Sequence, residues 1–128
     1  AIQTVERILN FFPPHQHAMI REQISLVIEG VLSQRLLRRK DGGGRVPAVE
    51  VMLGTPTVKE LLSEGKTTDL SKAIAQGRAY FGSQTFAQCL LELVQSDVVE
   101  AEEALAAADD PEELKLDMRG IKRGSRFS

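Results

Sequence analysis

The first thirty residues carry two stripes of apolar side chains at helical spacing. From Ile2 to Phe12 apolar residues recur every three or four positions, a pattern that predicts one face of an amphipathic helix. Pro13 follows and ends this helix, because proline lacks the N–H and clashes with the preceding turn. The same spacing resumes at Ile20 and predicts a second helix that ends near Gly30.

The pattern then becomes one typical of β structure. Residues 31–39 and 45–53 read as extended arms, and the Asp-Gly-Gly-Gly run at residues 41–44 between them accepts positive backbone dihedrals at little cost. The second arm is rich in β-forming residues, but its Pro47 cannot donate to a ladder and therefore predicts an edge or bulge position. We expect a β-hairpin here.

Downstream of the hairpin the signals are helical. Thr55 as N-cap, with Pro56 at the first helical position, predicts a short helix that Gly65 ends. Its successor is expected to run through Tyr80 and to close at Gly82. Three further helix starts carry capping-box spacing: Thr85 with Gln88, Asp97 with Glu100, and Asp110 with Glu113.

These elements predict an α+β fold that is mostly helical. It consists of an N-terminal helix pair, one β-hairpin and a C-terminal helical bundle. Residues 121–128 are basic and lack apolar periodicity, so we expect a frayed tail there.

Composition and charge limit the partners and the cellular location that we expect. Charged residues make up 27% of the chain and the net charge is only −2, so no global field points to nucleic acid or to an anionic membrane. No apolar run is long enough for a membrane span. A lone cysteine, Cys89, lies among apolar neighbours at helical spacing and is expected in the core, which fits a reduced, cytosolic setting. The start at Ala1, directly inside a helical pattern, hints at a piece of a longer protein.

The tripeptide Gly65-Lys66-Thr67 resembles the end of a phosphate-binding loop. The full motif needs a glycine five residues before Gly65, where this chain has Glu60, and it must lead from a strand into a helix. A carboxylate at that place would repel phosphate. We therefore interpret the tripeptide as a helix stop and restart.

Two charge runs stand out in the sequence. A basic cluster surrounds the hairpin turn: Arg35, Arg38, Arg39, Lys40 and Arg45. No aromatic residue interleaves with it to stack bases, which favours a solvated or subunit-facing turn over nucleic-acid binding. The second run has nine acidic residues at positions 97–117, followed by four basic residues at 118–128. It is interpreted as solvated helix faces, with tail ordering or partner binding as alternatives.

The chemistry of a self-sufficient enzyme is missing from the sequence. His15 and His17 are the only histidines and alternate in the chain, which makes a poor metal site. No serine lies in a nucleophile-elbow context, and no carboxylate pair has a predicted His or Lys partner. We expect no catalytic, cofactor-binding or metal residues in this chain.

Several ordered blocks resemble the twitching-motility (PilT-like) secretion ATPases, hexameric P-loop motors that power type IV pilus retraction. The match runs to about Asp97 and rests on these segments: Thr4-Val5-Glu6-Arg7-Ile8, Phe12-Pro13, Arg39-Lys40-Asp41-Gly42, Glu50-Val51-Met52 and Gln84-Thr85-Phe86.

The most informative block is the helix after the hairpin. Retraction motors carry there an Ala-Ile-Arg-Asn-Leu-Ile-Arg-Glu stretch that the family is thought to need for retraction more than for hydrolysis. Glu60 stands where the family has an amide, and Ser63 where it has an arginine. The resemblance implies a retraction or coupling element of eight residues: Thr57, Val58, Lys59, Glu60, Leu61, Leu62, Ser63 and Glu64.

The resemblance also implies a domain division. Residues 1–54 would form the C-terminal end of the P-loop core, with the hairpin extending its sheet; residues 55–120 would form a helical subdomain, and 121–128 the basic tail. The Walker motifs would lie upstream, so ATP and magnesium belong to the longer parent and this chain alone should be inactive. Implied partners are other subunits of a homohexamer and the pilus machinery at the inner membrane, in a cytoplasmic, peripheral location, without nucleic acid or direct membrane insertion.

Two alternatives stay open from the sequence. One is the C-terminal region of a pilus assembly or type II secretion ATPase, although those relatives often carry a four-cysteine metal element near the hairpin that this chain lacks. The other is a free-standing helical interaction module.

Overall fold

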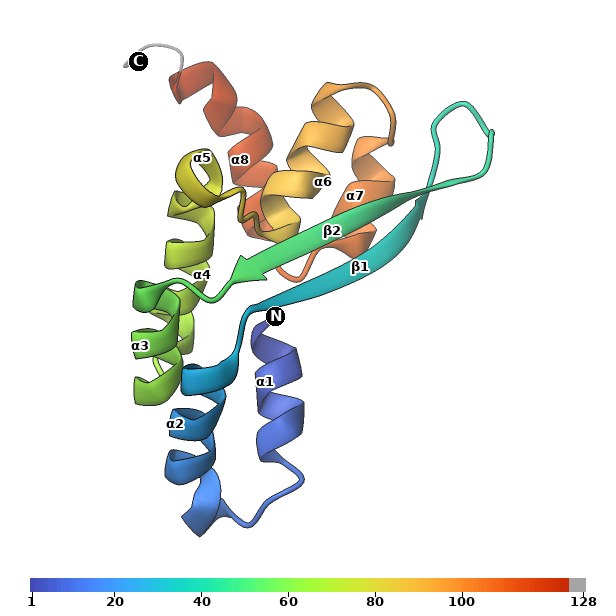
Figure 1. Cartoon of the computed structure of the whole chain (residues 1–128). Helices are drawn as coiled ribbons and strands as arrows, with labels where there is room; N and C mark the ends of the chain where they lie inside the picture. The colour runs from blue at the N-terminus through green and yellow to red at the C-terminus, as the bar shows by residue number, and fades with distance from the viewer. Residues whose placement is uncertain (125–128) are drawn as a thin grey trace. The chain divides into compact units, whose positions relative to one another are not determined.

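The computed structural model describes the backbone of residues 1–124 and the side chains of residues 1–120 (Figure 1). Helices dominate, and the strands form one two-stranded sheet, so the predicted mostly helical α+β class is confirmed. Contacts divide the chain into two compact units. The first comprises Ala1–Ser33 and Glu50–Thr85, and the second comprises Gln34–Val49 and the chain from Phe86 onward.

The hairpin forms where the sequence predicted it. Strand β1 spans Gly30–Arg38 and strand β2 spans Arg45–Leu53. The N–H of Arg39 donates to the carbonyl of Gly44 at 2.9 Å and closes the turn. Because the sheet has two strands, each has an outer edge, which accommodates Pro47 in β2. In both strands, the half near the turn belongs to the second unit and the other half belongs to the first.

The first unit contains the helices on either side of the hairpin in sequence: α1 (Ile2–Leu9), η1 (Pro14–Gln16), α2 (His17–Val27), α3 (Pro56–Glu64), α4 (Thr67–Gln76) and α5 (Arg78–Phe81). Its core joins the apolar stripes of these helices with Met52 from β2, which is fully buried. The N-terminal helix pair is confirmed, but α1 ends at Leu9, so Phe11 lies beyond it and is 86% exposed.

One helix of the first unit differs from the prediction. The sequence suggested a continuous helix through Tyr80, whereas the structure has α4 and α5 with a break at Gly77, and Tyr80 is 86% exposed. A Cβ at Gly77 would lie 2.5 Å from the Ser83 hydroxyl oxygen. That hydroxyl donates to the carbonyl of Ile74 at 2.7 Å. The close approach of Ser83 therefore explains why glycine stands at the break. Gly82 closes α5 in the left-handed conformation, as expected.

The second unit packs the distal hairpin with α6 (Phe86–Gln95), α7 (Ala101–Ala107) and α8 (Pro111–Gly124). Leu37 and Ala48 from the two strands are buried with Leu90 and Leu114 from the helices. Cys89 is half-buried beside this core, and its sulfur accepts a hydrogen bond from the N–H of Val49 at 3.4 Å.

The predicted starts of the last two helices have different outcomes. Asp110 accepts from the N–H of Glu113 at 3.1 Å, as a cap should. The capping box at Asp97 was wrong: α7 begins at Ala101, and Asp97 has a positive φ of 60°. Its carboxylate pairs with Lys40 instead, at 2.6 Å.

The predicted boundaries compare with the structure as follows. The backbone of α8 continues through Gly124, four residues past the predicted boundary at 120, and residues 125–128 of the predicted tail lie outside the described residues. Contacts place residues 55–85 with the N-terminal helices, so the compact units cut across the predicted division between residues 54 and 55. The division by family domain stays a prediction.

Candidate functional site

The predicted coupling element is helix α3, whose two ends are fixed by caps. At the start, the hydroxyl of Thr55 accepts a hydrogen bond from the N–H of Val58 at 3.3 Å. At the end, Gly65 adopts the left-handed conformation with φ 71°. The N–H groups of Gly65 and Lys66 donate to the carbonyls of Leu62 and Leu61, which is a Schellman arrangement. The local sequence signals therefore set both boundaries.

The eight residues of the element divide between a buried and an exposed face. Val58 and Leu62 lie in the core of the first unit, 3% and 4% exposed. Leu61 is half-buried against the same core. The exposed side chains are Thr57, Glu60 and Glu64, at helical spacing, with Lys59 and Ser63 half-buried. Only the exposed face is available for recognition.

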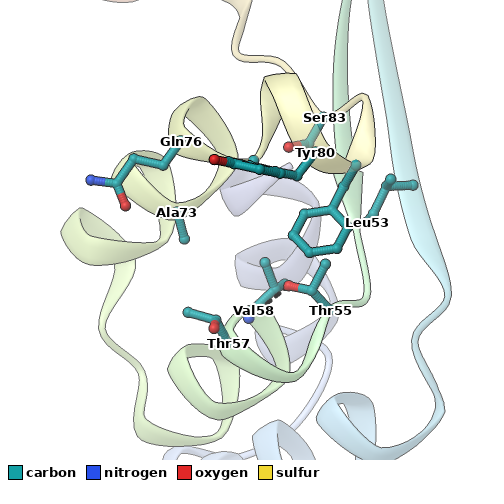
Figure 2. A pocket seen from close by; sticks show the side chains of 10 residues that line it. Leu53, Thr55, Thr57, Val58, Ala73, Gln76, Tyr80 and Ser83 are labelled. Atoms are coloured by element: carbon teal, nitrogen blue, oxygen red, sulfur yellow. Dashed lines mark hydrogen bonds between the residues drawn. The ribbon is translucent and has the colours of Figure 1, made fainter.

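A pocket of about 270 Å³ opens beside the start of α3 (Figure 2). Thr55, Thr57 and Val58 lie on one side of it, and Ala73, Gln76 and Tyr80 on the other. Phe81 also lines it and is 59% exposed. The walls are apolar at Leu53, Val58, Ala73 and Phe81, whereas the threonine, tyrosine, serine and glutamine side chains supply hydroxyl and amide groups. The pocket therefore lies between the start of α3 and helices α4 and α5, within the first unit.

The helix boundary at Gly65-Lys66-Thr67 does not fit a nucleotide phosphate. The tripeptide connects α3 to α4, so it follows a helix where a phosphate loop follows a strand. The ammonium of Lys66 lies 2.9 Å from the Glu64 carboxylate. This hydrogen bond, with the attraction of the same carboxylate, raises the pKa of Lys66 above its ordinary value. The predicted helix stop and restart is confirmed.

Two residues of the basic cluster, Arg35 and Lys40, pair with acidic and carbonyl groups from the C-terminal part of the second unit. Arg35 donates to the carbonyl of Ala107 at 2.5 Å and to the carboxylate of Asp109 at 2.7 Å. Its guanidinium also lies 4.5 Å from the centroid of the Phe86 ring. Hydrogen bonding to Asp97 raises the pKa of Lys40. Part of the acidic run is thus paired with the hairpin, a contact that the sequence did not indicate.

The histidines and the other possible metal ligands among the described residues form no metal site. A nitrogen of His17 lies 2.8 Å from the carbonyl of Phe12, in a local contact. Among the described residues, no group of three or more His, Cys, Asp or Glu side chains is placed to hold a metal ion. Within residues 1–124, no helix combines the length and apolar character that a membrane crossing requires.

Comparison with known proteins identifies the relatives of this chain. No protein-family model matches it. The type IV pilus retraction ATPase PilT of Pseudomonas aeruginosa is 38% identical over 112 residues, covering 88% of this chain and 32% of PilT. The chain belongs to the PilT-like family. The type IV pilus ATPase PilU of the same organism is 36% identical, covering 98% of this chain and 32% of PilU. The twitching motility protein of Neisseria gonorrhoeae is 35% identical, covering 91% of this chain and 31% of that protein.

A solved PilT-like structure supports the same assignment. The crystal structure of the pilus retraction motor PilT with bound ADP superposes with a TM-score of 0.74 at 34% identity, over 90% of this chain and 31% of that one. The Legionella pneumophila ATPase DotB superposes with a TM-score of 0.62 at 17% identity, which is a likeness of fold. The chain spans about a third of the length of the curated relatives it matches, in their C-terminal part.

Sequence reasoning missed two features of the PilT-like chain. The exposed aromatic pair Tyr80 and Phe81 beside the pocket was hidden because Tyr80 continues the helical spacing of α4. The three contacts of Arg35 could not be predicted, because its partners lie more than fifty residues away in sequence. A Gly at position 77, where the helical pattern continues, was the available signal for the first feature.

Proposed function

We propose that this chain is the C-terminal region of a hexameric motor ATPase that powers type IV pilus retraction. ATP and magnesium would be bound by the upstream part of such a motor, and this region would transmit the nucleotide-driven rearrangement to the pilus machinery. The observation that carries the proposal is the 38% identity to PilT over 88% of the chain, together with the TM-score of 0.74 to the retraction motor.

We propose α3 as the coupling element of this motor. Its core face ties it to α4, so a displacement of the first unit would carry the helix with it. Its exposed face presents Thr57, Glu60 and Glu64 to a partner protein, with Glu64 also paired to Lys66. A short helix that is capped at both ends and anchored by Val58 and Leu62 is suited to transmit movement without unwinding.

The proposed partners and location follow from this role. Other copies of the subunit would complete a homohexamer, and the pilus machinery at the inner membrane would receive the force. The protein would act in the cytoplasm, peripheral to that membrane. Related motors for pilus assembly or secretion would share the fold and differ in which assembly the exposed face of α3 contacts.

The coupling role is tested by reversing one exposed charge on α3 in the full-length protein. Glu60→Lys changes the exposed face, whereas Lys72→Glu makes the matched reversal at an exposed position of the neighbouring helix α4. Twitching on agar reports retraction, and the ATP hydrolysis rate of the purified protein reports the motor core. We expect Glu60→Lys to lose twitching with hydrolysis within about twofold of the parent, because only partner recognition changes.

Lys72→Glu is expected to keep both properties. Normal twitching in the Glu60→Lys strain, or an equal loss in the Lys72→Glu strain, would remove α3 from the proposed role. Leu61 and Leu62 are poorer test positions, because a charge at Leu62 would enter the core and unfold the unit.

A further inference from the structure

The outer edge of strand β1 near the turn is covered by a segment that is not a strand. Residues alternate in direction along a strand, and the N–H of Arg39 donates into the hairpin, to Gly44. The N–H groups of Arg38 and Lys40 therefore point to the opposite, outer edge. Both are occupied: Arg38 donates to the carboxylate of Glu103 at 3.0 Å, and Lys40 to the carbonyl of Val98 at 2.8 Å.

Side-chain contacts continue this cover in both directions along β1. At the turn, the ammonium of Lys40 lies 2.6 Å from the Asp97 carboxylate. Further down the strand, Arg35 binds the carbonyl of Ala107 and the carboxylate of Asp109. Contacts therefore pass from Lys40 in the turn through Arg38 to Arg35 in β1, while they pass up the sequence from residue 97 to residue 109. The segment follows the edge in the antiparallel sense that a third strand would take.

A helix in this place supplies few backbone partners, so a side chain replaces them. The carbonyls in the first turn of helix α7 are used within the helix, and the carboxylate of Glu103 takes the place of a strand carbonyl opposite Arg38. Buried Ala104 and half-buried Leu105 attach the same helix to the core of the second unit. Apolar contacts thus hold this segment against the core, and charged side chains pair with the edge of the strand.

We propose that residues 97–109 act as a strap that closes this part of β1 against strand addition by a second copy of the chain. An open edge at Arg38 would present a free N–H beside Leu36, which is 56% exposed on the strand. Exposed edges with apolar side chains pair readily with other strands. The strap removes the donors that such pairing needs.

The test uses the 128-residue chain and compares three single variants. Glu103→Ala removes the acceptor at Arg38, Glu103→Gln keeps an acceptor oxygen at the same place, and Glu102→Ala removes a neighbouring exposed carboxylate. Amide hydrogen exchange by NMR reports the Arg38 N–H, and the Arg39 N–H serves as internal control because its partner Gly44 lies within the hairpin. Sedimentation velocity over a range of concentrations reports self-association.

In Glu103→Ala we expect Arg38 exchange to accelerate at least about tenfold with Arg39 unchanged, and self-association to rise with concentration relative to the parent chain. The Glu103→Gln and Glu102→Ala variants should behave as the parent. Unchanged exchange at Arg38 would overturn the proposal. Fast exchange without increased self-association would overturn it equally, because the edge would then be open and still not pair. Equally faster hydrogen exchange at Arg39 would mean that Glu103 stabilises the whole unit and does not protect this edge in particular, which would also contradict the proposal.

Discussion

The guanidinium of Arg35 lies 4.5 Å from the centroid of the Phe86 ring. In this position it also reaches the carbonyl of Ala107 and the carboxylate of Asp109. One side chain of β1 therefore contacts the first residue of α6, the last residue of α7 and the connection from α7 to α8. The planar guanidinium suits this arrangement, since it can stack on a ring while its N–H groups donate in the ring-parallel plane.

Replacing Arg35 is predicted to destabilise the chain more than replacing another arginine of the basic cluster. Arg35→Ala should lower the free energy of unfolding by about 2 kcal/mol, because it removes two hydrogen bonds and the aromatic contact. Arg39→Ala should cost much less, because Arg39 pairs with the exposed carboxylate of Asp41. Urea denaturation measures both changes. Equal midpoints for the two variants would contradict the role of Arg35.

The glycine at the end of α3 is predicted to be required by its backbone conformation. Gly65→Ala should destabilise the first unit by about 1 kcal/mol, because φ is 71° and a Cβ would also lie 3.3 Å from the side chain of Arg21. Gly65→Asn should cost less, since asparagine tolerates the left-handed region better. Thermal denaturation measures the order. The matched control Gly120→Ala, in α8 with no atom within 4 Å of the new Cβ, should stabilise by about 0.5–1 kcal/mol.

If Gly65→Ala and Gly120→Ala shift the melting temperature in the same direction, the cap at Gly65 does not have the conformation described. This comparison isolates backbone conformation, because both changes add one methyl group to a glycine.

How far the sequence predicts this structure depends on the range of the interactions involved. The ends of α3 followed from Thr55 and Gly65, because caps and left-handed turns are decided by neighbouring residues. The hairpin followed from its glycine run for the same reason. The break at Gly77 did not follow, because the approach of the Ser83 hydroxyl depends on how the chain returns after Gly82.

The same distinction applies to the charged residues. Asp97 carries a helix-start signal in the sequence, but it lies in the left-handed turn that closes α6, where the N–H groups of Asp97 and Val98 donate to the carbonyls of Val94 and Leu93. Its carboxylate pairs with Lys40, 57 residues away, a contact that the sequence does not indicate. The eight residues of the proposed coupling element come from the family resemblance alone and stay a prediction. Their division into a buried face with Leu62 and an exposed face with Glu60 needed the packing of the first unit. That division determines which substitutions test function and which test folding.

The turn of the hairpin should respond to acid through Asp41. The N–H of Gly43, at 2.7 Å, and then the guanidinium of Arg39, at 2.8 Å, lower the pKa of Asp41 below its ordinary value of 3.8. A lowered folded-state pKa means that the stabilisation is present above the unfolded value and is lost as pH falls through the folded one. NMR titration of the Asp41 carboxyl carbon measures this. Arg39→Gln should raise the pKa only part of the way, and a full return to 3.8 would contradict the leading role of Gly43.

The tripeptide Gly65-Lys66-Thr67 is predicted to have no part in nucleotide chemistry. The purified 128-residue chain should show no ATP turnover above the buffer rate, and Lys66→Ala should leave ATP binding unchanged, because Lys66 follows a helix and pairs with Glu64. A coupled assay measures turnover and a fluorescent ATP analogue measures binding. Turnover that disappears in Lys66→Ala would contradict this interpretation.

The central claim is that the chain serves a retraction motor, and the amount of surface pilin tests it most directly. In the organism that encodes the chain, deletion of its gene should abolish twitching while surface pilin stays the same or rises, because pili would still be assembled and no longer withdrawn. Shearing pili from the cells and quantifying pilin against total protein measures this. Loss of surface pilin together with twitching would assign the chain to an assembly motor, and unchanged twitching would contradict any motor role in pilus dynamics.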